Sequence, residues 1–572
     1  MKKSLLLAKT FFGRFFENDL MPPGLPQAQL VIWGLAFLAM PGLLLPTRLA
    51  AKYMILERNG LPVAHALLAD RLIFITITMT SMGLVALIIW DGMFPDRRDA
   101  RILAALPLPG WIPILGRLLA LGALAGILLG GINFVPTLIY GPTVARYGGA
   151  SNVFQGAGAH FLSTACAGMF VFSSLVALQG LGLNVGGRRA AERLSVLLQV
   201  IFVIALLQLV FSMMRVSAML PADLRAPWLY AVPSVWFLGL NDVLGGRPVA
   251  GAASLGALAA LATAVSIGAA VGLFAGTHAR LTRLALESRE LPRRRTGFYT
   301  LKALTERLTF RPAAKAVFDF TLHTVARSRS HRLLLSTYVG VGLALVASTI
   351  APRVIRLGVA ALAVPEVETV SAPLVITFAA LIGMRVALAI PVEPRANWVI
   401  RLHEPVDRTA VLNGVRAAML AIGVIPTSVL AFASAGFLWG LQTAFVHAFV
   451  VFVMGWLLIE ILLLGLAKIP FTCTYFPGKS RIRTLWPLYV SGFINYAYTT
   501  AAIELALFQS PRGLVIFSTI VGLAIAVLFL SRQRWIRSLQ GLRFQEEDPD
   551  AMFEGFHLSE GLAARSREHL KP

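Results

Sequence analysis

The amino-acid sequence predicts an all-α, polytopic membrane protein with about twelve transmembrane helices, arranged as two six-helix halves. Of its 572 residues, 57% are hydrophobic and only 14% are charged, and the mean hydropathy is +0.74. A soluble chain of this length does not bury so much apolar surface. A helical span needs about 20 apolar residues, and only helices satisfy their own backbone hydrogen bonds in hydrocarbon.

The apolar stretches place the spans in chain order. We expect them at residues 30–47, 72–90, 113–140, 159–185, 194–214, 251–275, 333–350, 371–391, 414–437, 443–466, 485–505 and 513–530. With the N-terminus inside, cytoplasmic segments hold 37 of the 51 Lys and Arg, external segments 11 and spans three. This positive-inside asymmetry predicts that both termini lie in the cytoplasm, and we expect the membrane to be the bacterial inner membrane. The net charge of +23 then favours anionic inner-leaflet lipids, and not nucleic acid, as partners.

Two amphipathic segments organise the chain. Residues 1–29 are expected to form an interfacial helix and linker, because six apolar side chains share one helical face: Leu5, Ala8, Phe11, Phe12, Phe15 and Phe16. Residues 276–332 are expected to form a basic cytoplasmic linker with a second interfacial helix, since His278–Arg332 carries 13 basic against 4 acidic residues. The remaining predicted parts are a first six-span half at 30–275, a second at 333–530 and a cytoplasmic tail at 531–572.

The cytoplasmic loops after the second and eighth spans indicate a weak internal repeat. An offset of 298 residues aligns Arg97 with Arg395, Ile102 with Ile400, Pro107 with Pro405 and Gly116 with Gly414. Both loops occupy the same position within their six-span half, which argues against a chance similarity.

The first of these loops combines charged, apolar and proline residues. It reads Asp91-Gly92-Met93-Phe94-Pro95-Asp96-Arg97-Arg98-Asp99, followed by Leu103 and Leu106-Pro107-Leu108-Pro109. Together with the N-terminal helix and an external apolar stretch, Val232–Leu244, that is too short to cross, it resembles the membrane permeases of ATP-binding-cassette transporters, type-2 exporter group. Units of that class have six spans, a coupling helix between spans two and three, and an external hairpin between spans five and six. They pair as dimers, whereas here both units would be fused.

The resemblance implies a separate cytoplasmic ATPase, in two copies, that drives transport through the coupling loops. Residues expected to contact it are Asp96, Arg97, Arg98, Asp99, Arg101, Leu103, Leu106, Pro107, Arg395, Trp398, Arg401, Glu404 and Pro405. The alternative is an ordinary inner loop whose arginines follow the positive-inside bias. Export of a large apolar or amphiphilic cargo is what the class implies.

A further motif loop follows the tenth span. Its residues Lys468, Pro470, Phe471, Cys473, Tyr475, Pro477, Gly478 and Lys479 are similar to a stretch in bacterial membrane proteins of related type. Gly478-Lys479-Ser480 supplies only the end of a phosphate-binding loop, and position 473 is Cys where such a loop needs Gly. We therefore expect no nucleotide site, no catalytic activity, no cofactor and no metal centre in this chain.

Charges inside spans are costly and are therefore functional candidates. Arg385 and Glu460 lie at matching depths of about 9 Å from the inner interface by helical rise, and are expected to form an intramembrane polar pair. The alternatives are that Arg385 snorkels to the headgroups and that Glu460 pairs with Lys468. Glu504 is expected at the interface.

Two alternative functions stay open. A secondary transporter of the major-facilitator type, driven by an ion gradient, shares the six-plus-six topology. It differs in having a short loop after the second span and no interfacial helices. A membrane enzyme acting on lipid-linked substrates would need clustered acids or histidines. The histidines within spans, His160 and His447, are interpreted as packing residues.

Overall fold

The computed structural model divides the chain into two compact units. Unit 1 comprises Met1–Phe298 with Gly340–Gly358, and unit 2 comprises Tyr299–Val339 with Val359–Pro572. The structure describes residues 2–15, 45, 49, 51–61, 63–95, 99, 102–103, 105–147, 150–221, 223–246, 248–287, 312–390, 408–464, 466, 469–471 and 490–537. The division falls inside the basic stretch 276–332, and residues 340–358 belong to unit 1.

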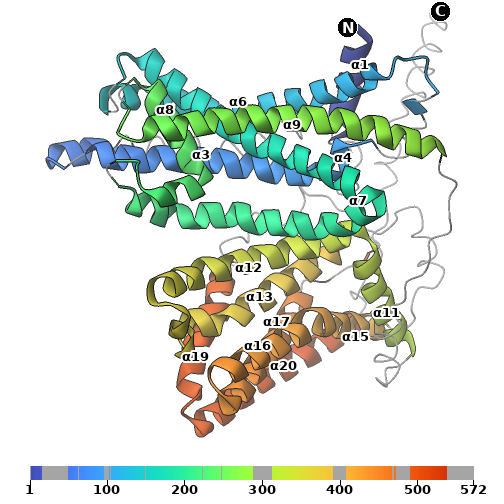
Figure 1. The fold of residues 1–572 in the computed structure, drawn as a ribbon. Coiled ribbons are helices and arrows are strands. Elements are labelled where there is room, and N and C mark those ends of the chain that lie inside the picture. The colour runs from blue at the N-terminus through green and yellow to red at the C-terminus, as the bar shows by residue number, and fades with distance from the viewer. Residues whose placement is uncertain are drawn as a thin grey trace, which may run out of the picture. The chain divides into compact units, whose positions relative to one another are not determined.

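Unit 1 is built from long apolar helices (Figure 1). Its elements are α1 (Lys2–Arg14), α3 (Val63–Ile88), α4 (Trp90–Met93), α6 (Trp111–Tyr147), α7 (Val153–Met219), η1 (Pro227–Ala231), α8 (Pro233–Leu244) and α9 (Ala252–Glu287). The helix α7 runs without a break through two predicted spans, because residues 186–194 between them are also helical. The core lies among α3, α6, α7 and α9.

Unit 2 is also helical (Figure 1). Two of its segments are π-helical. Its elements are α11 (Pro312–Arg327), α12 (Arg329–Leu357, shared with unit 1), η2 (Val359–Ala363), α13 (Val367–Ala387), α15 (Arg408–Met419), η4 (Leu420–Val424), α16 (Ile425–Leu438), α17 (Leu441–Leu464), η5 (Asn495–Thr499), α19 (Thr500–Leu507) and α20 (Pro511–Arg537). The helix α17 packs against α13, α16, α19 and α20. The π segments are η4 and η5, a rare geometry that is frequent at functional sites.

The described residues contain no strand and include 10 helices long and apolar enough to cross a membrane. Each of these corresponds to one predicted span, so the chain is an all-α, multi-pass membrane protein. The other two predicted spans are 30–47, which lies almost wholly outside the described residues, and 485–505, of which only 490–505 is described. The total of twelve therefore stays a prediction.

In each unit an amphipathic helix packs closely against a glycine of a helix that follows it in the chain. In unit 1, α1 packs on α6 so closely that a methyl group at Gly116 would lie 3.0 Å from the Cβ of Leu7 and 3.2 Å from the carbonyl oxygen of Ser4. In unit 2, α11 packs on α15, and a methyl group at Gly414 would lie 2.5 Å from the carbonyl oxygen of Ala314. The two glycines are those that the sequence offset aligns, so the same local packing occurs in both units.

The face of α1 that packs against protein includes two residues of the predicted apolar face. Its buried residues are Ser4, Ala8, Phe11 and Gly13. Leu5, which the sequence also places on the apolar face, is 68% exposed. Small residues allow α1 to approach Gly116 of α6 closely.

The apolar stretch Val232–Leu244 of unit 1, which is too short to cross a membrane, contains a short helix. The helix α8 has 12 residues, fewer than a span needs, and seven of them are buried. It lies against α9, where Gly239 would place a methyl group 2.8 Å from the carbonyl oxygen of Ala252.

Candidate functional sites

The segment that follows α3 in unit 1 is held by the carboxylate of Asp99. Arg14 of α1 donates to its Oδ1, and Arg117 of α6 donates to its Oδ2 over 3.3 Å. Arg117 also donates to the carbonyl oxygen of Gly92 over 2.9 Å. Asp99 is only 7% exposed. One buried carboxylate therefore joins the segment to both α1 and α6.

Apolar side chains of the same segment remain exposed. Ile102 is 47% exposed, Leu106 is 45% exposed and Pro107 is exposed, whereas Leu103 is half-buried. The other predicted coupling residues lie outside the described residues: Asp96, Arg97, Arg98, Arg101, Arg395, Trp398, Arg401, Glu404 and Pro405. Asp99 stays a predicted coupling residue, but its described contacts are internal and make it a brace for the segment.

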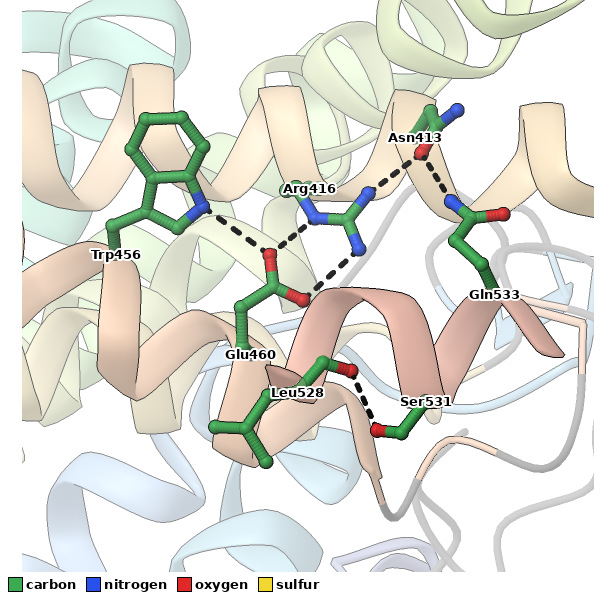
Figure 2. Close-up of polar contacts among 7 residues, drawn as sticks. All are labelled: Asn413, Arg416, Trp456, Glu460, Leu528, Ser531 and Gln533. Atoms are coloured by element: carbon green, nitrogen blue, oxygen red, sulfur yellow. Dashed lines mark hydrogen bonds and ion pairs between the residues drawn. The ribbon is translucent and has the colours of Figure 1, made fainter. Parts of the chain in front are cut away.

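The most extensive polar site of unit 2 is centred on Glu460 of α17 (Figure 2). Arg416 of α15 donates Nε–H to its Oε1 over 2.5 Å and Nη2–H to its Oε2 over 3.0 Å. The indole of Trp456 donates to Oε1 over 3.2 Å. Asn413 accepts from Arg416 over 2.6 Å and from Gln533 of α20 over 3.2 Å. The side chains of Glu460 and Arg416 are 0% and 6% exposed.

The ion-pair partner of Glu460 is Arg416, and not Arg385, the residue with which it was expected to form a polar pair. The Nε–H of Arg385 donates instead to the carbonyl oxygen of Leu462, over 3.2 Å, two residues further along the chain. Arg532 of α20 likewise donates to the carbonyl oxygens of Leu464 and Leu466. The last carbonyls of a helix lack partners within it and carry partial negative charge, so arginines are suited to this end of α17.

Arg416 is the residue that the sequence analysis missed. It is one of the three basic residues inside predicted spans, and it lies two residues after the predicted start of its span at position 414. Its partner is 44 residues away in the sequence, and matching by depth alone selected Arg385. The available signal was the presence of a second arginine inside a predicted span of the same half.

Only the first residues of the motif loop are described. Pro470 and Phe471 are buried, and Phe471 has a φ of 64°, a left-handed conformation that is unusual outside glycine. Its backbone N–H donates to the carbonyl oxygen of Leu388 over 2.9 Å, and its ring lies 5.6 Å from that of Phe320. Lys468, Cys473, Tyr475, Pro477, Gly478 and Lys479 lie outside the described residues.

Unit 1 contains a second polar cluster at the N-terminal end of α3. Asp70 accepts from Lys52 over 2.8 Å and from the hydroxyl of Tyr53 over 2.6 Å. Burial raises the pKa of Tyr53, which keeps its hydroxyl protonated as a donor. Arg71 donates to Asp242 of α8 over 3.0 Å. Asp70 and Arg71 directly precede the predicted span 72–90, whereas in the structure both belong to the helix α3.

The two histidines that lie within predicted spans, His160 and His447, are each near the beginning of a helix and beside an aromatic ring. His160 of α7 is 5.4 Å from the ring of Tyr140, and His447 of α17 is 5.6 Å from that of Trp439. His447 differs in having an acidic partner, since its Nδ1 lies 2.7 Å from Oε1 of Glu504. Glu504 was expected at the interface, but it is fully buried.

The described residues contain no group of three or more His, Cys, Asp or Glu arranged to hold a metal ion. Comparison with models of protein families, with curated proteins and with solved structures finds no match to this chain.

Proposed function

We propose that this chain is the membrane-spanning permease subunit of an ATP-driven transporter, coupled to a separate cytoplasmic ATPase that hydrolyses the ATP. The observation that carries the proposal is the segment between α3 and α6, which is internally braced yet exposes apolar side chains. An ordinary loop has no need of a buried carboxylate that joins it to two helices. A segment that transmits force needs both rigidity and an apolar surface for docking.

The contacts of Asp99 supply a path for that force. A push on the segment at Leu106 reaches Asp99 and is passed through Arg14 to α1 and through Arg117 to α6. Because α1 packs closely on Gly116 and shares the carboxylate of Asp99 with α6, we expect the two helices to move together. The segment is then a lever on the first transmembrane bundle.

Unit 2 supports the proposal by its repeated packing. The close packing of α11 on Gly414 corresponds to that of α1 on Gly116. Such a correspondence is expected when one six-span unit is duplicated in a single chain. The second coupling loop lies outside the described residues, so its contact with an ATPase stays a prediction. We propose that the transporter exports its cargo. We also propose that the segment between α3 and α6 lies on the cytoplasmic side of the membrane.

The test is purification of the full chain from its own host, followed by measurement of ATP hydrolysis in the purified complex. Leu106→Glu should lower the co-purified ATPase activity at least tenfold, because a buried charge opposes docking of an apolar ridge. The matched control is Leu61→Glu. Leu61 is 52% exposed and precedes α3, whereas Leu106 follows it, so the control should leave the activity unchanged.

Equal losses in the two variants would contradict coupling through this segment. Complete absence of ATP hydrolysis in the wild-type preparation, with transport in vesicles driven by an ion gradient alone, would favour the major-facilitator alternative. The buried His447–Glu504 pair is the observation that favours that alternative, since ionisable pairs inside membrane bundles can carry protons.

A further inference from the structure

The contact between His447 and Glu504 is buried inside unit 2. Nδ1 of His447 on α17 lies 2.7 Å from Oε1 of Glu504 on α19, and the two side chains are 1% and 0% exposed. The edge of the Trp439 ring lies against the imidazole, and the indole N–H is engaged by the carbonyl oxygen of Leu362 over 2.9 Å. Buried apolar residues of the same helices are Ala444, Val450, Val451, Ala501 and Leu507. The pair therefore lies in a low-dielectric environment.

One oxygen of the carboxylate is left without a hydrogen bond. Among the described residues, Oε2 of Glu504 is buried and has no partner, and the hydroxyl of Tyr496 is in the same situation. Tyr496 lies eight residues before Glu504, within the π-helical η5 segment from which α19 continues. An unsatisfied buried polar group lowers the stability of the folded state, so this arrangement is held at a cost to the stability of unit 2.

Electroneutrality decides how many protons the pair holds. A neutral imidazole beside a carboxylate would leave one uncompensated negative charge in the bundle, which is strongly unfavourable. Adding a single proton to the pair removes that net charge, whichever of the two groups carries it. The 2.7 Å separation of Nδ1 and Oε1 allows the proton to be shared in a hydrogen bond.

The other charged and titratable groups on the packed helices are few at this end of unit 2. Glu368 lies in the first turn of α13 and Arg512 near the start of α20, while Tyr496 and Tyr498 belong to η5. At the other end of α17 are Arg385, Arg416, Glu460 and Arg532. The helix α16 has no titratable side chain. No described bond joins any of these groups to the pair, so His447 and Glu504 form a local unit.

We propose that His447 and Glu504 are a proton-binding site within unit 2. One proton is held between Nδ1 of the imidazole and Oε1 of the carboxylate, and it leaves only when water reaches the pair. A conformational change that hydrates this end of α17 and α19 is then linked to release of the proton, and the pH on that side biases the change. This site is independent of the ATPase-docking segment, so the proposed function does not depend on it.

The test uses the full-length protein in lipid nanodiscs and the fluorescence of Trp439, which an adjacent imidazolium quenches. The chain has 10 tryptophans, so the signal is the difference between the wild type and Trp439→Phe. We expect a one-proton transition between about pH 4 and 10. His447→Gln should abolish it. Glu504→Gln should move it to lower pH, because a neutral amide does not stabilise an imidazolium.

A control substitution at another buried histidine and a second measurement on the wild type distinguish loss of the proton site from misfolding of a variant. His160→Gln should leave the transition unchanged, since His160 lies beside Tyr140 and its described contacts include no carboxylate. Glu504→Asp should retain it. Infrared difference spectra of the wild type across the transition should contain a carboxyl band that Glu504→Gln lacks. A transition that survives His447→Gln in folded protein would overturn the proposal. So would a wild type that shows neither a pH-dependent Trp439 signal nor a pH-dependent carboxyl band of Glu504.

Discussion

Removal of either partner of the Arg416–Glu460 ion pair should destabilise unit 2 far more than removal of both. The pair is almost completely buried, and two hydrogen bonds of 2.5 and 3.0 Å join it. Glu460→Leu leaves a buried guanidinium, and Arg416→Met leaves a buried carboxylate. Each single substitution should lower the free energy of unfolding by about 3–5 kcal/mol.

The double substitution is expected to cost much less. Replacing a buried ion pair by apolar residues of similar size is often close to neutral. Here the indole N–H of Trp456 also loses its acceptor, which adds about 1–3 kcal/mol. Asn413 keeps its contact with Gln533. The two single effects together are about 6–10 kcal/mol, so the coupling between Arg416 and Glu460 should be at least about 3 kcal/mol.

The assay is a double-mutant cycle on unfolding in mixed micelles, followed by loss of helical circular dichroism. The control cycle combines Glu460→Leu with Arg385→Met. It should give a coupling below about 1 kcal/mol, because the described bond of Arg385 goes to a main-chain carbonyl that no side-chain substitution removes. Additive effects of Arg416→Met and Glu460→Leu would refute the reasoning, as would a stronger coupling in the Arg385 cycle.

Three further predictions concern packing, the braced segment and pH. Gly414→Ala should lower the thermal midpoint, since its methyl group would lie 2.5 Å from a main-chain oxygen and overpacking costs about 1–3 kcal/mol, whereas Gly126→Ala has open space and should be neutral or stabilising by up to about 1 kcal/mol. Asp99→Asn should speed proteolysis between α3 and α6 and reduce co-purified ATPase activity, because two arginines lose their shared countercharge. The hydrogen bond from Tyr147 is the main cause that lowers the pKa of Glu57, so this carboxylate stabilises the fold above its unfolded-state pKa of about 4.3, and the contribution is lost as the pH falls through the lowered folded-state value. The thermal midpoint of the wild type should therefore exceed that of Glu57→Gln at pH 7, and the difference should vanish in acid; a difference that persists there would contradict the assignment.

The sequence by itself determined where the chain is apolar and helical. The positions of ten membrane helices, the two amphipathic helices and the short helix α8 follow from the length and periodicity of apolar runs, which are local properties. Even Gly116 and Gly414 could be matched before their packing was known, because both occupy the same place in a repeated order of segments.

Only the tertiary structure decided which polar side chains meet. Arg416 and Glu460 are 44 residues apart, and His447 and Glu504 are 57 apart, so their contact depends on the rotation and register of separate helices. Depth in the membrane restricts the position of a side chain along one axis and leaves its direction around the helix open, which is why matching by depth selected Arg385. The packing of small residues against glycine fixes that rotation, as it does for α1 on α6, and it is encoded across segments that are distant in the chain.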